Sequence, residues 1–215
     1  MVMSMPSNKV MESMIQRINA SQKGKAFVLS DFADLGSYDA IKKAFSRLAA
    51  EGKLIRVHRG IYQKPNYNEF LQQEVTLSPR EVAEAVARAY GWHIVPSGDA
   101  ALNQMGLSTQ VPAVYEYVTD GPHKTIRYAQ FIIKLKRRTN REISEISPKS
   151  ALLIEAIKAI GKERMNKEIR AKMMSKFSKA EKKKLLKEAQ RTRSWVYEEI
   201  KTMTSEVDNH LTNSQ

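Results

Sequence analysis

The sequence predicts a mixed α+β fold, and three patterns indicate it. Residues 30–65 read as a short helix, a glycine turn, a longer helix and a β-hairpin. Residues 114–135 hold short runs rich in β-branched and aromatic residues, which is typical of strands. From residue 147 onward, apolar residues recur at helical spacing. We therefore expect three domains. The first covers residues 1–76, and the second is a mixed α+β domain over residues 77–150. The third is a helical, lysine-rich extension over residues 151–215 that packs on the middle domain.

The first helix is expected to begin at Ser7, because one stripe of apolar residues follows at the 3.6-residue period. Its members are Val10, Met11, Met14, Ile15 and Ile18. Gly24 breaks the chain, and residues 27–29 read as a very short strand. Ser30 is a suitable cap for a short helix that ends at Gly36.

Ser37 is a suitable N-cap for the next helix, which Gly52 ends. The inward positions are Ile41, Ala44, Phe45, Leu48 and Ala49, and the outward positions are Tyr38, Lys42, Lys43, Ser46 and Arg47. A strand over 54–57, a turn at Arg59-Gly60 and a return strand follow. This order of elements predicts a winged helix-turn-helix domain, with the hairpin as the wing.

The outward face and the hairpin carry the side chains that duplex DNA attracts. The major groove admits one α-helix, and cations on a hairpin reach the neighbouring phosphates. The predicted DNA-binding residues are Ser37, Tyr38, Lys42, Lys43, Ser46, Arg47, Arg56, His58, Arg59 and Lys64. The alternatives are a solvated helix face and a winged helix that binds another protein.

The composition favours a polyanionic partner. The 215-residue chain has a formal net charge of +13, and solubility alone is the competing explanation of that charge. Cysteine is absent, which suits a reducing compartment and excludes disulfides. The amino terminus has no apolar core of a signal peptide, and no apolar run approaches the ~18–20 residues that cross a bilayer. We expect a cytoplasmic protein with no membrane partner.

In the middle region, Ser78-Pro79 with Glu81 is a strong helix start, and Gly91 ends that helix. A strand is expected at 92–95, and a helix from Pro96 to Gly106. Three further strands are expected at 114–118, 124–128 and 131–135, with residues 119–122 as the turn that joins the first two.

We find no constellation for catalysis here. Gly98-Asp99 is similar to a fragment of a nucleotidyltransferase site, but the spaced carboxylate pair of that site is missing. The four histidines lie far apart, without acidic residues at ligand spacing, so we expect no metal, no cofactor and no enzymatic activity. The end of the strand expected at 131–135 is basic and comprises Lys134, Lys136, Arg137, Arg138 and Arg141. This group is either a solvated sheet edge or a second DNA contact.

Two more helix starts follow. Ser147-Pro148 opens a helix that ends at Gly161, and Ser178 with Glu181 forms a capping box for a long helix to about Met203. Residues 161–193 carry 13 basic and 4 acidic side chains. The lysines of this region form either a solvated helix face, which is the default interpretation, or a phosphate-binding surface.

Two segments together resemble the AbiEi-type antitoxins of abortive-infection toxin–antitoxin systems. One is the run DFADLGSYDAIKKAFSRLAAEGKLIRVHRGIYQKP, and the other is PSGDAALNQMGLSTQVP followed by strands. The resemblance spans about residues 7–160 and does not extend to the lysine-rich tail. It implies a winged-helix domain that represses its own promoter through inverted repeats, as a monomer or weak dimer on double-stranded DNA. It also implies a C-terminal domain that counteracts a co-encoded nucleotidyltransferase-like toxin.

Two other functions compete with this expectation. One is a stand-alone winged-helix transcriptional regulator whose C-terminal domain senses a ligand or partner. The other is an enzyme that acts on nucleic acid or nucleotides, which requires clustered acid–base or metal-binding residues that the sequence does not offer. The neighbouring gene distinguishes the antitoxin from the stand-alone regulator, because only an antitoxin needs an adjacent toxin.

Overall fold

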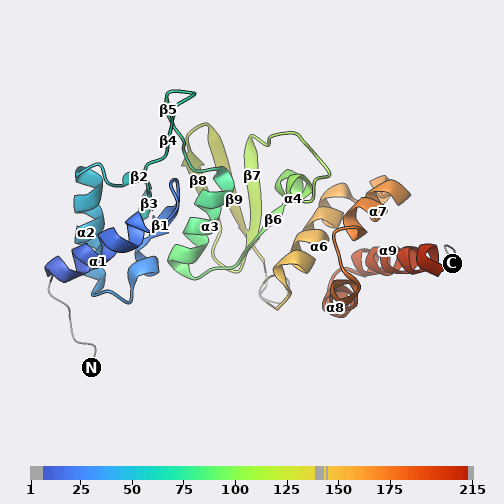
Figure 1. The fold of residues 1–215 in the computed structure, drawn as a ribbon. Coiled ribbons are helices and arrows are strands. Elements are labelled where there is room, and N and C mark those ends of the chain that lie inside the picture. Colours follow the sequence, from blue (N-terminus) through green and yellow to red (C-terminus); the bar gives the residue numbers. More distant parts are fainter. Residues whose placement is uncertain (1–6, 139–142, 144, 213–215) are drawn as a thin grey trace. The chain divides into compact units, whose positions relative to one another are not determined.

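The computed structural model describes residues 7–138, 143 and 145–212, and it confirms a mixed α+β protein (Figure 1). The chain divides into two compact units, Met1–Trp92 and His93–Gln215. From the sequence we expected three domains with boundaries after residues 76 and 150. The structure has one boundary, after residue 92. Each unit has its own sheet and its own core.

The first unit combines helices with two small antiparallel sheets. One sheet has the strand order β1-β3-β2, and the other is the β4–β5 hairpin (Figure 1). The elements are α1 (Ser7–Asn19), β1 (Ala26–Val28), the 3₁₀ helix η1 (Leu29–Phe32), α2 (Tyr38–Ala50), β2 (Ile55–His58), β3 (Ile61–Gln63), β4 (Tyr67–Asn68), β5 (Gln73–Glu74) and α3 (Pro79–Tyr90).

A run of aromatic rings joins these elements at the core. Phe32 lies between Phe27 of β1 and Phe45 of α2, with ring centroids 5.6 and 5.3 Å apart. Phe45 then stacks on Tyr62 of β3 at 4.5 Å, with the ring planes 22° apart. The apolar stripe of α1 closes the core through Val10, Met14 and Ile18, which are buried as its periodicity predicts. The sheet, η1 and α2 therefore share one packed interior.

The short second helix differs from its prediction in how it is capped. It is a 3₁₀ helix, and the carboxylate of Asp31 accepts the Val28 N–H at 2.9 Å, whereas the Ser30 hydroxyl donates to the carbonyl of Arg88. Gly36 does not have a left-handed backbone. A Cβ there would meet a methyl carbon of Val10 at 3.0 Å, so the glycine serves the close approach of the loop to α1.

Helix α3 belongs to the first unit because it is bonded to β1 and η1. The guanidinium of Arg88 donates to the Ala26 carbonyl at 3.1 Å and pairs with Asp31 at 3.3 Å. The predicted capping box is present, since Ser78 accepts from the Glu81 N–H and the Glu81 carboxylate accepts from the Ser78 N–H. Because of these contacts, the first unit ends at residue 92 and not at the expected residue 76.

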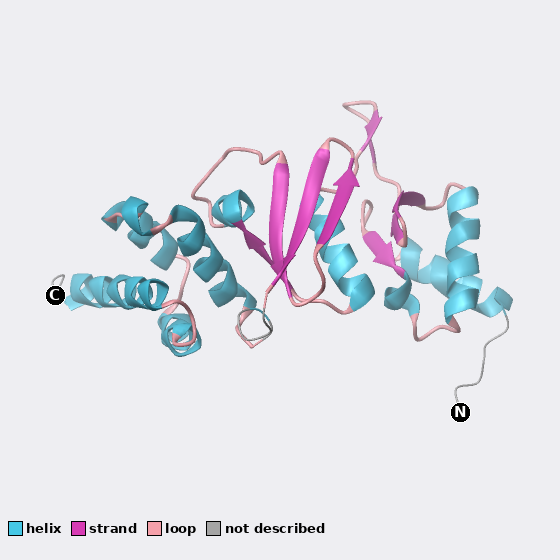
Figure 2. Cartoon of the chain, turned by 180° about the vertical axis from the view of Figure 1, so that it is seen from behind, coloured by secondary structure: helices cyan, strands magenta, loops and turns pink. Residues whose placement is uncertain are grey.

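The second unit holds a four-stranded sheet and a set of helices (Figure 2). Its elements are β6 (Ile94–Ser97), α4 (Gly98–Gln104), β7 (Val114–Thr119), β8 (Lys124–Tyr128), β9 (Phe131–Arg137), α6 (Pro148–Ile160), the 3₁₀ helix η2 (Lys162–Arg164), α7 (Lys167–Met174), α8 (Lys179–Ala189) and α9 (Ser194–Thr212). All four strands agree with their predicted positions to within a few residues.

The strand order of this sheet is not the one that the chain order suggests. The order is β6-β7-β9-β8, with β9 parallel to β7 and antiparallel to β8. Residues 119–122 connect β7 to β8 as expected, but the two strands are not paired with each other, because β9 lies between them. Asp120 instead accepts the backbone N–H of His93 at 2.8 Å, and the Thr119 hydroxyl donates to the His93 carbonyl. Thr119 and Asp120 therefore hydrogen-bond to the residue that precedes β6.

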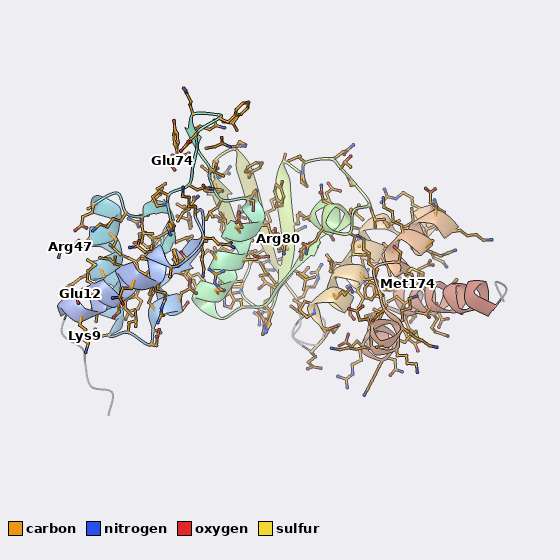
Figure 3. All side chains as sticks on the ribbon, in the orientation of Figure 1. Lys9, Glu12, Arg47, Glu74, Arg80 and Met174 are labelled. Carbon is orange, nitrogen blue, oxygen red and sulfur yellow. The ribbon has the colours of Figure 1, made fainter. Side chains whose placement is uncertain are left out.

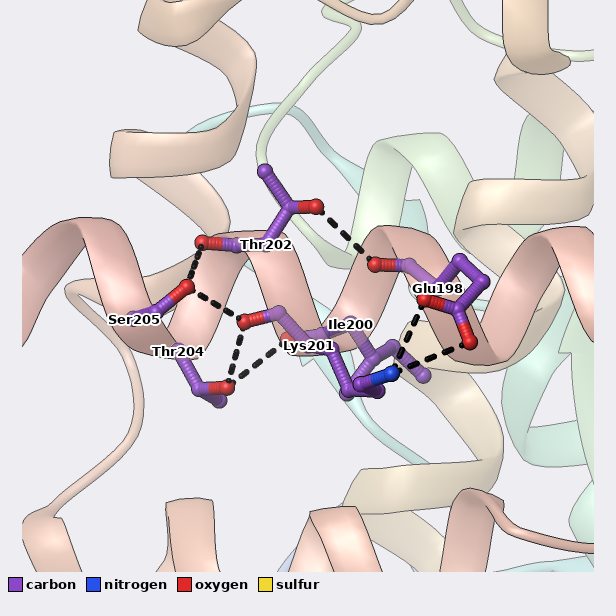
Figure 4. Close-up of polar contacts among 6 residues, drawn as sticks. All are labelled: Glu198, Ile200, Lys201, Thr202, Thr204 and Ser205. Atoms are coloured by element: carbon purple, nitrogen blue, oxygen red, sulfur yellow. Dashed lines mark hydrogen bonds and ion pairs between the residues drawn. The ribbon is translucent and has the colours of Figure 1, made fainter.

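The predicted long helix to Met203 is also wrong, because it breaks between Ala189 and Ser194. The N–H and the hydroxyl of Thr192 both donate to the Ala189 carbonyl, which ends α8. The break lets both helices bury apolar residues in the core around α6. Along α9, hydroxyls of Thr202, Thr204 and Ser205 donate to carbonyls one turn earlier (Figure 4). Among the helices that the structure describes, none is long and apolar enough to cross a bilayer.

We predict that Phe45→Ala destabilises the first unit by about 3–5 kcal/mol, because it removes a ring that contacts both Phe32 and Tyr62. Phe70→Ala is the matched control, since Phe70 is 93% exposed and its truncation should stay within about 0.5 kcal/mol. Native-state hydrogen exchange of the α2 amides measures both changes. Equal protection factors in the two variants would show that the packing of Phe45 against Phe32 and Tyr62 does not stabilise α2.

Candidate nucleic-acid interface

Helix α2 has one buried and one exposed face. Ser37 caps it by accepting the Ala40 N–H at 3.4 Å, and Ile41, Ala44, Phe45 and Leu48 are buried. The exposed face presents Tyr38, which is 67% exposed, followed one turn later by Lys42 and Lys43. The Ser46 hydroxyl donates to the Lys42 carbonyl at 3.1 Å, so it is engaged with its own helix.

Arg47 is exposed but its charge is shared. Its Nε donates to Oε1 of Glu51 at 2.8 Å, and the ammonium of Lys53 pairs with the other oxygen of that carboxylate at 2.9 Å. The hydrogen bonds from Lys53 and Arg47 lower the pKa of the Glu51 carboxyl. The expected outward cation at this end of α2 is therefore a three-residue ion cluster with one net positive charge.

The β2–β3 hairpin presents two exposed guanidiniums. Arg56 lies on β2 and Arg59 in the turn, where Gly60 has a φ of +77° that favours glycine. The register shifts between Arg56 and His58, which indicates a bulge. The side chain of His58 is only half exposed and has contacts of its own.

Lys64 does not join this surface as the sequence suggested. Its ammonium donates to the carbonyls of Asn19 at 2.9 Å and Ser21 at 2.7 Å, beyond the last turn of α1. The backbone of Lys64 also bonds to Gly24 and Lys25. A cation is well placed at a helix C-terminus, where carbonyls lack partners. Lys64 thus fastens the end of α1 to β3.

The four cations that remain are Lys42, Lys43, Arg56 and Arg59. Within the described part of the chain, none of them makes an ion pair or a side-chain hydrogen bond. Asp39 is the one acidic side chain on the exposed face of α2, in the first turn where the helix dipole favours it. Figure 3 labels Arg47 on α2 and Arg80 on α3. The Phe45–Tyr62 stack joins α2 to β3 of the hairpin.

A second exposed feature lies in residues 66–77, to which the sequence analysis assigned no helix or strand. They form the β4–β5 hairpin, with Phe70 93%, Leu71 55% and Tyr67 52% exposed. The Leu71 N–H donates to the side-chain oxygen of Asn68, which shapes the tip. Residues 65–79 carry two glutamates and no cation in a chain of net charge +13. Because β4 and β5 have two residues each, the sequence holds no alternating strand pattern that would have predicted this hairpin.

The histidines and the acidic side chains were the remaining candidates for a metal site. No group of three or more His, Asp or Glu side chains there is placed to hold a metal ion. His93 pairs with Asp120 at 2.7 Å, and this contact fixes the start of β6. Of the basic strand end, Arg141 lies outside the described residues, and Lys136 pairs with Glu116.

The fold and the exposed cations together define a mixed α+β protein with a cationic helix-and-hairpin surface. A protein-family model matches residues 13–186, and its description is a family of unknown function, DUF6088. Since the match covers well over half of the chain and runs from α1 into α8, the chain belongs to this family. No curated protein matches the chain.

We predict that Lys64→Met destabilises the first unit by about 1–2 kcal/mol, because two charge-assisted hydrogen bonds are removed while the apolar stem is kept. Arg59→Met is the control and should change stability by less than about 0.5 kcal/mol, since Arg59 is exposed in a turn. Hydrogen exchange of the amides at the end of α1 and in β3 measures the difference. Equal effects would contradict a structural role for Lys64.

Proposed function

We propose that the first unit is a winged helix-turn-helix domain that binds double-stranded DNA. The order α1-β1-η1-α2-β2-β3, with η1 and α2 as the helix pair and the β2–β3 hairpin as the wing, supports this proposal. The single observation that carries it is the set of four exposed cations without acidic partners on α2 and the hairpin. That set comprises Lys42, Lys43, Arg56 and Arg59.

In this proposal α2 lies in the major groove with its exposed face toward the bases. Tyr38, Lys42 and Lys43 are at the N-terminal half of the helix, which reaches base edges or phosphates first. Arg56 and Arg59 bind the neighbouring backbone or minor groove, where guanidinium groups suit phosphate oxygens. Phosphate contacts supply affinity, and the recognition helix supplies the register on the duplex.

We further propose that the protein acts in the cytoplasm as the antitoxin of a toxin–antitoxin pair and represses its own promoter. The resemblance of residues 7–160 to AbiEi-type antitoxins supports this proposal. The exposed apolar hairpin over Tyr67–Glu74 favours a protein partner in addition to DNA, because acidic residues repel nucleic acid and aromatic side chains suit protein interfaces. The second candidate is a transcriptional regulator that senses a ligand or partner and has no toxin.

We predict that Arg56→Ala combined with Arg59→Ala weakens binding to the protein's own promoter at every sequence tested. The slope of log affinity against log salt should flatten by about one for each phosphate that the variant no longer binds. Arg80→Ala is the control, because Arg80 is an exposed arginine of the same unit that pairs with Glu84 on α3. Fluorescence anisotropy over a salt series measures the slopes. A double variant with the slope of the control would refute the role of the hairpin in DNA binding.

We predict that the variant with Lys42, Lys43, Arg56 and Arg59 all changed to alanine loses repression but still protects cells from the adjacent gene's product. Growth during co-expression measures protection, and a promoter fusion measures repression in the same cells. Loss of both functions in a folded variant would contradict their separation. An adjacent gene that does not impair growth would favour the regulator.

A further inference from the structure

A small cleft in the second unit has no role in the DNA-binding proposal. Its volume is about 210 Å³, and it lies where the end of β6, the strands β7 and β9, and the helix α6 meet the residue before α9. In the strand register Ser97 of β6 faces Glu116 of β7, and Lys136 of β9 reaches the Glu116 carboxylate at 2.7 Å. The cleft is thus built by the sheet and the central helix of this unit.

The charges of the lining residues do not cancel. Glu116 pairs with Lys136, and on α6 the carboxylate of Glu155 pairs with Lys158 at 2.8 Å. Arg138 and Arg193 line the same cleft, and in the described part of the chain neither has an acidic partner. Two guanidiniums are therefore in excess. Both arginines are exposed residues at the edge of the cleft, and two guanidiniums without a carboxylate partner favour a bound anion there.

A serine hydroxyl also lines the cleft. Ser97 is only 6% exposed and lines the cleft. It occupies the N-cap position of α4, yet its side chain makes no capping bond, and the described residues supply no other hydrogen bond to it. Since α4 does not use this hydroxyl as a cap, it can donate to a ligand in the cleft. The cleft therefore offers one neutral donor beside two cationic ones.

We propose that this cleft binds the phosphate group of a small phosphomonoester or inorganic phosphate. Such a group carries close to two negative charges, which the guanidiniums of Arg138 and Arg193 neutralise. Guanidinium forks match phosphate oxygens in pairs, and the Ser97 hydroxyl donates to a further oxygen. Glu116 and Glu155 hold the two lysines in place, and their charge keeps the anion on the arginine side of the cleft.

Isothermal titration of the full-length protein at constant ionic strength tests the proposal with three ligands. They are inorganic phosphate, thymidine 5′-monophosphate, and a short oligothymidylate with free 5′ and 3′ hydroxyls. We expect the first or the second to bind, and the stronger of the two identifies the source of the phosphate. Absence of binding by both would overturn the proposal. Oligothymidylate binding that Arg138→Gln and Arg193→Gln weaken as much as they weaken phosphate binding would overturn it as well, because that ligand offers only phosphodiesters.

The variants locate the site. Arg138→Gln and Arg193→Gln should each weaken binding by about tenfold or more, and Ser97→Ala by about threefold to tenfold. Arg191→Gln is the matched control, because Arg191 lies two residues before Arg193, is exposed and pairs with Glu145 at 2.9 Å. Circular dichroism shows that each variant is folded. Equal affinities for Arg193→Gln and Arg191→Gln would overturn the assignment of the cleft. The Arg138→Gln and Arg193→Gln variants leave the cations of the first unit unchanged, so a loss of phosphate binding in them is distinguishable from a failure of DNA binding by the first unit.

Discussion

The stacking of Phe45 on Tyr62 is the interaction on which the cationic surface of the first unit depends. The rings lie 4.5 Å apart, and they join the middle of α2 to β3. Lys42 and Lys43 precede Phe45 on the helix, whereas Arg56 pairs with Tyr62 across the β2–β3 ladder. The distance between the two pairs of cations is therefore set by a buried stack of rings, not by the cations. A surface held in this way gives up little conformational freedom when it binds a rigid duplex.

Local signals predicted the starts of α2, α3 and α8. Ser37, and the capping boxes Ser78–Glu81 and Ser178–Glu181, are present as expected, because a cap involves atoms only a few residues apart. The stripe of α1 is buried for a similar reason, since its period alone defines one face. The insertion of β9 between β7 and β8 was not predictable in this way. Strand order depends on contacts across the unit, and the strand patterns of the sequence are compatible with either arrangement.

The candidate site shows the same limit at the level of single side chains. Residue type and helical spacing predicted which residues of α2 point outward, and Tyr38, Lys42 and Lys43 are exposed. The same reasoning does not find what an outward side chain bonds to. Lys64 donates to carbonyls of residues 19 and 21, which are more than 40 positions away in the chain. Arg47 shares Glu51 with Lys53, and this triad needs the turn after α2 to bring Lys53 back. Charge alone therefore predicts more DNA contacts than the geometry supports.

The two exposed features of the first unit differ in chemistry, and this difference bears on the choice between the proposed functions. The α2 and hairpin cations suit a polyanion, because phosphate contacts release counterions and need no apolar area. The β4–β5 hairpin offers Phe70 and Leu71 beside Glu69 and Glu74, a combination that a phosphate backbone repels. Large apolar side chains that gather on a protein surface are costly unless a partner covers them. A domain that only occupied an operator would have no use for such a hairpin. A regulator that also binds a protein would, and this favours the hypotheses in which a macromolecular partner controls DNA binding over those in which a small ligand does.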